Sequence, residues 1–411
     1  MFSILVCFVL PLLSYFRVNL VGEVSLTEGV LIIYGLLNIR KFVRMWADKR
    51  VKWVVLLALA WLVMAIVSDF YRQTPKEDFL RGWARIIVLI WSIFSIGNLV
   101  WDDRNKIVAF AMGQFCSIGL YYLVYGSDLP LYKFIVGFSV SGAAFCLAAR
   151  LEAANTAIAR LIPFGAGALA FFNNARSLAG ITLIAAFYPY IYYSNKIRTK
   201  LFTPAVVIPM VVLLIGGLGL LQFYKFGASS GLLGEEALQK YSEQVSATTG
   251  DFSIIDGRGE IFFSWPKIRE SPIIGWGSWA RDLQFVMDRQ AQLGLKDTGG
   301  DRVIPDLIPA HSHFFGAWLE AGIVGGLFWL LVLALIIQVF LSNAMAFMGK
   351  FRAFGVFMMN LFFWDILFSP FGGERRVFNG FLIWVVIVAL AYSDRMKKLQ
   401  SSKSKAESVA Y

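Results

Sequence analysis

The chain has only two histidines, His311 and His313, and they stand directly before a long apolar run. A histidine titrates near neutral pH and can accept a proton from an attacking hydroxyl group. The structural alternative is an interfacial polar residue at a helix start, with Ser312 as the N-cap. The His-x-His spacing is also compatible with a metal ion. No acidic or cysteine partner is nearby in the sequence, however, so we expect no metal site.

Arg176 and Arg258 are the next candidates, because a guanidinium holds phosphate oxygens in a bidentate fork and keeps its charge at all relevant pH. Arg176 lies between two apolar runs, and Arg258 lies within residues 256–260, Asp-Gly-Arg-Gly-Glu. The structural alternative for Arg176 is an arginine that snorkels toward lipid headgroups. The alternative for Arg258 is a surface ion pair with Asp256 or Glu260.

A further basic pair, Arg375 and Arg376, follows Glu374 just before the last apolar run. It could bind phosphate or an acidic sugar, or it could pair internally through Glu374. A mixed-charge segment at residues 71–85 leaves the same two interpretations open. Several cations and one titratable base suit an anionic, membrane-bound substrate. A lipid diphosphate that carries a sugar chain has this chemistry, since the arginines would stabilise the leaving diphosphate.

The elements that must position these residues are apolar helices. Of the 411 residues, 58% are hydrophobic and 16% are charged, whereas a soluble domain has about a quarter charged residues. The apolar runs predict an all-α, polytopic membrane protein with about twelve transmembrane helices of roughly 20 residues each. The predicted spans are 3–19, 23–38, 53–70, 84–101, 107–125, 132–149, 156–173, 177–194, 201–222, 312–340, 353–370 and 377–393.

Basic residues predict the orientation of the chain. The segments 40–52, 195–200 and 395–398 are basic and fall on one side together with both termini, so the positive-inside rule makes that side cytoplasmic. The net charge of +11 is explained by these short segments, and we expect no nucleic-acid partner. The predicted organisation is given by four regions: helices 1–9 in 1–222, a large periplasmic loop in 223–310, helices 10–12 in 311–394, and a solvated cytoplasmic tail in 395–411.

The residues around His311 resemble a known family. His311-Ser312, then nine residues, then Gly322-Ile323-Val324-Gly325 resembles the H-[NSQ]-x9-G-x-x-[GTY] signature of bacterial O-antigen ligases. Residues 318–322 also resemble the wider O-antigen ligase/polymerase superfamily, and Ala175-Arg176-Ser177 resembles its S-R motif with Ala in place of Ser. The superfamily's loop pattern is similar to this set: Gly257, Arg258, Trp265, Glu270, Pro272, Gly275 and Gly277.

The resemblance implies a metal-independent, inverting glycosyltransferase of the bacterial inner membrane, with a GT-C-like fold, an active site on the periplasmic face and no cofactor. The implied donor is a glycan on undecaprenyl diphosphate, and membrane lipids surround the chain. The acceptor would be lipid A–core in a ligase, which we favour, or another lipid-linked glycan in a polymerase. His311 becomes the expected catalytic base, and Arg176 and Arg258 the expected diphosphate binders. The auxiliary residues are His313, Arg375, Arg376 and Glu320.

A transporter or flippase of a lipid-linked glycan is the alternative from another class. Such a protein would need charged or helix-breaking residues at mid-membrane and two similar halves. Asp365 is the clearest acid within a predicted span, and the sequence shows no matching halves.

Overall fold

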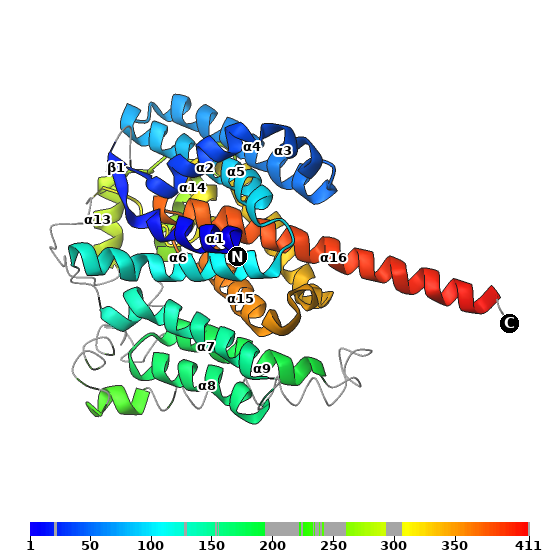
Figure 1. The fold of residues 1–411 in the computed structure, drawn as a ribbon. Coiled ribbons are helices and arrows are strands. Elements are labelled where there is room, and N and C mark those ends of the chain that lie inside the picture. Colours follow the sequence, from blue (N-terminus) through cyan, green and yellow to red (C-terminus); the bar gives the residue numbers. More distant parts are fainter. Residues whose placement is uncertain are drawn as a thin grey trace.

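The structure is a computed structural model of the chain. It describes residues 1–19, 23–126, 130–152, 154, 156–193, 222, 225–232, 234, 238, 241, 260–292 and 306–409. Arg258, the basic segment 195–200 and all but the last residue of the predicted span 201–222 lie outside these residues. Within them the fold is a bundle of helices with one short β-hairpin (Figure 1). The expected all-α class is thereby confirmed.

Seven helical segments of the described chain are long and apolar enough to cross a membrane, which makes the protein a candidate multi-pass membrane protein. These segments are α4 (Lys49–Arg72), α5 (Lys76–Val100), α6 (Arg104–Tyr125), η2 (Leu131–Val136) with α7 (Gly137–Leu151), α14 (His313–Leu341), η4 (Ala344–Phe351) with α15 (Arg352–Phe368), and α16 (Arg376–Val409). Each overlaps a predicted span, although the ends differ by up to nine residues at α5 and at η4 with α15, and α16 continues well beyond its span.

Four shorter apolar helices account for four of the remaining predicted spans. They are α1 (Phe2–Leu12) with η1 (Leu13–Tyr15), α2 (Leu26–Leu37), α8 (Thr156–Phe172) and α9 (Arg176–Tyr193). Further helices of the described chain include α3 (Ile39–Met45), α12 (Glu260–Glu270), α13 (Leu283–Gln292) and η5 (Gly373–Arg375). The structure therefore supports several spans, while the full number of about twelve remains a prediction.

The first two predicted spans, 3–19 and 23–38, are too long at the ends that face each other. An antiparallel hairpin of β1 (Arg17–Asn19) and β2 (Glu23–Ser25) lies between the helices. Ser25 and Glu28 form a capping box, which satisfies free backbone donors and fixes the true start of α2. The Ser-x-x-Glu spacing was visible in the sequence as the sign of a helix start.

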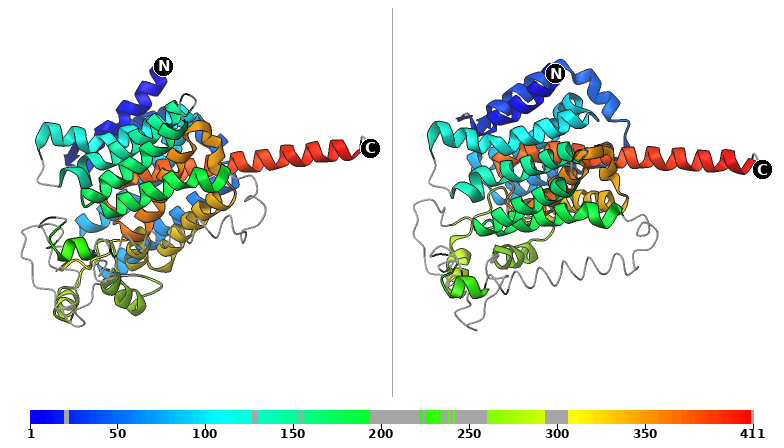
Figure 2. Two further views of the ribbon diagram at one scale, coloured as in Figure 1. Left: turned by 90° about the horizontal axis from the view of Figure 1, so that it is seen from below. Right: turned by 60° about the horizontal axis from the view of Figure 1, so that its bottom comes forward.

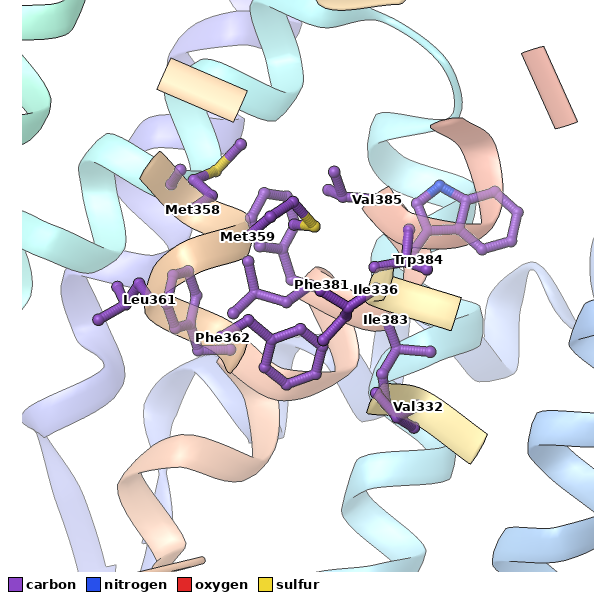
Figure 3. Packing of buried hydrophobic residues seen from close by; sticks show 14 of the residues in the cluster. Val332, Ile336, Met358, Met359, Leu361, Phe362, Phe381, Ile383, Trp384 and Val385 are labelled. Carbon is purple, nitrogen blue, oxygen red and sulfur yellow. The ribbon is translucent and has the colours of Figure 1, made fainter. Parts of the chain in front are cut away.

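The core of the bundle is built around α16, in which 83% of the apolar span is buried, against 33–56% in the other six. Aromatic and aliphatic side chains of α14, α15 and α16 meet there, among them Ile336, Phe362 and Phe381 (Figure 3). The helix then continues beyond the bundle to Val409 (Figures 1 and 2). The predicted solvated tail therefore begins as a continuation of this helix.

The two ends of the bundle are identified by contacts between distant segments. Arg50 at the start of α4 forms an ion pair with Asp394 of α16, and Arg395 lies 3.8 Å from Asp102. The basic segments 40–52 and 395–398 thus share one end, in agreement with the predicted orientation. At the opposite end, α4 and α15 finish while α5, α14 and α16 begin. We call it the His311 end, and it lies on the side of β1 and α13 in Figure 1.

Candidate functional site

His311 is exposed on a backbone that is fixed by the two residues after it. Ser312 caps α14, because its hydroxyl accepts a hydrogen bond from the Phe315 amide at 3.2 Å. The same hydroxyl donates to the Ile366 carbonyl of α15 at 2.9 Å. Ser312 is only 2% exposed. The cap that the sequence offered as a structural alternative is therefore present, and it fixes the backbone next to His311.

His313 is fully buried and uses both ring nitrogens. Nδ1 lies 2.6 Å from the Ser369 carbonyl, and the Asn379 amide lies 2.8 Å from Nε2. These partners assign the proton to Nδ1, which donates to Ser369, while Nε2 accepts from Asn379. His313 consequently ties the start of α14 to the segment before α16. It has an anchoring role, and His311 is the imidazole that a substrate can reach.

A break divides α14 into a short helix and a long one. Ala321 and Gly322 leave helical geometry, and Gly322 has φ +65°. A broken helix leaves backbone carbonyls without intrahelical donors. Here the Leu319 carbonyl accepts from the Trp276 amide at 2.8 Å, and the Glu320 carbonyl accepts from the Gly277 amide at 3.0 Å. The loop around Trp276 and Gly277 is separate in the sequence from the histidine signature. Backbone hydrogen bonds thus join the two.

Asp69 provides a second anchor for the same loop and was not singled out in the sequence. It is 2% exposed at the end of α4. Its carboxylate accepts from the Ser278 amide at 2.6 Å, the Ser278 hydroxyl at 2.8 Å and the Trp83 indole at 2.7 Å. A buried carboxylate is stable only with such donors. An acid inside the predicted span 53–70 was the available signal.

Arg85 and Glu320 form a largely buried ion pair at the centre of the His311 end, with side chains 12% and 15% exposed. Arg85 also donates to the Phe371 carbonyl at 3.0 Å. The other oxygen of Glu320 accepts from the Trp279 amide at 3.3 Å. The sequence left open whether the charged residues of the 71–85 segment bind a ligand or pair within the protein. Arg85 pairs within the protein.

The two arginines before α16 have different environments. Arg376 is buried and forms two contacts with the Glu28 carboxylate, one of them at 2.6 Å, and it donates to the Glu23 carbonyl at 2.7 Å. Arg376 thus has an internal partner, as the structural alternative expected, but the partner shown is Glu28. Arg375 is half-buried and donates to the Pro370 carbonyl at 3.0 Å. Among the described side chains, which do not include that of Glu374, no carboxylate lies within ion-pair distance of Arg375.

Arg176 begins α9 and lies at the His311 end. The evidence for this placement is Tyr188, which donates to Asn343 at 3.2 Å, because Asn343 follows α14 at the opposite end of the bundle. Between Arg176 and Tyr188 the helix rises about 18 Å. Arg176 and His311 thus share one end of the bundle, as the sequence predicted. Arg258 stays a prediction, since it lies outside the described residues.

A small lobe with its own core supports the loop around Trp276 and Gly277, which contacts α14. Its buried residues come from α12, α13, the segments around them and the short part of α14, and they are Ile268, Ala280, Val286, Ile308 and Leu319. Lys267 joins the lobe by contacts with Glu270 at 2.7 Å and Asp282 at 2.8 Å.

The Lys267–Asp282 pair predicts a flat pH dependence of stability near neutrality. Burial opposes both charges, but the hydrogen bond and the attraction between the partners prevail, so the pKa of Lys267 is raised and that of Asp282 is lowered. The contribution of Asp282 is complete above its unfolded pKa and disappears as the pH falls through the folded value. That of Lys267 is complete below its unfolded pKa and is lost as the pH rises through the raised value.

Thermal unfolding between roughly pH 5 and 9 should therefore show no change that depends on this pair. Asp282→Asn should lower the unfolding temperature throughout that range and reduce the further loss at acid pH. An equal acid sensitivity of the variant and the wild type would contradict the assignment.

Among the described residues, no group of three or more His, Cys, Asp or Glu side chains is arranged to hold a metal ion. No protein-family model matches the sequence, and the comparison with curated proteins finds no match. The arguments about function therefore rest on the residues and their geometry.

Proposed function

We propose that the protein is a membrane glycosyltransferase that moves a glycan from undecaprenyl diphosphate to an acceptor hydroxyl. The observation that carries the proposal is the exposure of His311 together with the anchoring of its backbone. This imidazole is exposed on a backbone fixed through Ser312 and His313. An anchored backbone limits how far the base can move, and general-base catalysis benefits because misplacement of a catalytic group is costly.

The charges at the His311 end support an anionic donor. Arg176 and Arg375 both lie there, on the side predicted to be extracytoplasmic, where basic residues are disfavoured without a function. Arg376 is assigned instead to the Glu28 ion pair. Arg258 keeps its proposed role as a second diphosphate ligand on the basis of the sequence alone.

In the proposed reaction, His311 takes the proton of the acceptor hydroxyl while the acceptor oxygen forms a bond to the anomeric carbon of the donor sugar. The bond between that carbon and the diphosphate oxygen breaks, and the electron pair leaves with the lipid diphosphate. The arginines stabilise the charge that develops on the diphosphate. Attack opposite to the leaving group inverts the anomeric centre, and no metal ion takes part.

We favour an O-antigen ligase with lipid A–core as the acceptor, in lipopolysaccharide or surface polysaccharide biosynthesis at the bacterial inner membrane. An O-antigen or exopolysaccharide polymerase of the same superfamily is the alternative. The two differ in their deletion phenotype. Loss of a ligase leaves long lipid-linked glycan unattached, whereas loss of a polymerase leaves single repeat units on the core.

The direct test is a transfer assay with the purified protein in liposomes that contain undecaprenyl-diphosphate-linked glycan and lipid A–core. We expect glycosylated lipid A–core to form in the presence of a metal chelator. Formation of longer lipid-linked glycan without glycosylated core would identify the polymerase. Movement of the donor across the bilayer with no transfer product would refute the proposal in favour of the transporter, in which Asp365, 8% exposed in α15, would be the first residue to test.

A further inference from the structure

One guanidinium connects three separate segments at the His311 end. Arg85 of α5 forms the ion pair with Glu320 at the end of the short helix 313–320, and it donates to the Phe371 carbonyl at 3.0 Å. Glu320 in turn accepts from the Trp279 amide at 3.3 Å. Arg85 therefore contacts the short helix and the 369–371 segment directly, and it reaches the loop around Trp279 through Glu320.

Phe371 transmits this support to the other end of the short helix. Its ring centroid lies 5.3 Å from that of His313 and 5.2 Å from that of Trp329, and the Arg85 guanidinium lies 5.4 Å from the same ring. Phe371 is 7% exposed. The same segment supplies the Ser369 carbonyl that binds His313. Arg85 thus supports the short helix directly at Glu320 and, through Phe371, at His313.

We infer that Arg85 and Glu320 are positioning residues, which hold the short helix and thereby fix His311 at the site. This inference rests on the proposed function for its catalytic consequence, but the anchoring itself is independent of it. The two terminal nitrogens of Arg85 donate to two different segments, so a lysine, which has a single ammonium on a flexible stem, cannot replace it. A shift of about 1 Å in a catalytic group costs roughly 10²-fold in rate.

The two histidines make the anchoring measurable without an activity assay. Diethyl pyrocarbonate modifies accessible imidazoles, and in a His311→Ala background His313 is the only histidine of the chain. His313 is fully buried, so its modification reports loosening of the short helix. The protein would carry a purification tag without histidine and would be assayed only as monodisperse material.

Arg81 is the matched control, because it lies one turn earlier on α5. It makes an exposed contact with Glu77 at 4.0 Å, with side chains 46% and 86% exposed. We expect His313 to be modified at least tenfold faster in Arg85→Ala and Arg85→Lys than in the parent, and at an unchanged rate in Arg81→Ala. Continued protection of His313 in both Arg85 variants would overturn the inference. Should Arg85→Ala aggregate, Glu320→Gln takes its place with the same expectation and the same contradicting result.

The catalytic consequence is tested in the transfer assay with His311 present. We expect the Arg85 variants to lower kcat by roughly 10²-fold and to change KM for the donor less than threefold. An effect confined to KM would assign Arg85 to donor binding and overturn its positioning role. If the wild type shows no transfer while Arg85→Ala exposes His313, the proposed function fails and the anchoring role stands.

Discussion

Replacing His311 with alanine is expected to lower the rate of glycan transfer by about 10²–10⁴-fold, the range typical of removing a general base. The physical reason is that no other histidine can accept the proton of the acceptor hydroxyl. His313 lies two residues away, but its ring nitrogens are occupied by Ser369 and Asn379. The measurement is the initial rate of glycan transfer in liposomes, with surface glycan in a complemented deletion strain as the cellular readout.

The control for this variant is a check that the fold around residue 311 is unchanged. The segment is anchored through Ser312 and His313, so His311→Ala should unfold at the wild-type temperature and should keep His313 protected from diethyl pyrocarbonate. Inserted His311→Ala protein that still supports full surface glycan would eliminate the catalytic role. Loss of both transfer and protection would show that the substitution disturbed the helix start, and His311→Asn would then be the variant to measure.

The sequence predicted the helices well because membrane spans are specified locally. An apolar run of sufficient length satisfies its backbone as a helix wherever it lies in the chain. This reasoning identified α4, α5, α6 and α14 to α16. It failed at the hairpin between α1 and α2, where two strands of three residues each occupy positions assigned to helix. Such short pairings carry too few residues to leave a periodic signal.

The common end of three candidate residues was predictable from the sequence, but the pairings of the charged side chains were not. Charge and motif placed Arg176, His311 and Arg375 together, since the orientation rule assigns loops to sides. The partners of buried charges are set by packing between distant segments. Arg85 finds Glu320 across 235 residues and Arg376 finds Glu28 across 348 residues. For the same reason the sequence could not separate His311 from His313, which differ only in the surroundings that the fold provides.

Gly322→Ala is expected to destabilise the fold strongly, because it removes the break on which the loop contact depends. At φ +65° a non-glycine residue costs about 1–2 kcal/mol. In addition, a Cβ at this position would lie 1.7 Å from the Ile273 carbonyl oxygen and 2.3 Å from its carbon. Backbone cannot rotate away as a side chain can, so the loop must move. We expect a total loss of more than about 3 kcal/mol, measured as a fall in the thermal unfolding midpoint.

Gly316→Ala is the matched control in the same short helix. Its added Cβ would meet the Ala310 Cβ and carbonyl oxygen at an ordinary 3.7 Å, and its φ is not in the left-handed region. Alanine favours a helix over glycine by up to about 1 kcal/mol, so this variant should be neutral or slightly stabilised. Equal stability of the two variants would show that the break at Gly322 is dispensable. A selective effect at Gly322 would establish that the contact between the loop and the short helix after His311 contributes strongly to the stability of the fold.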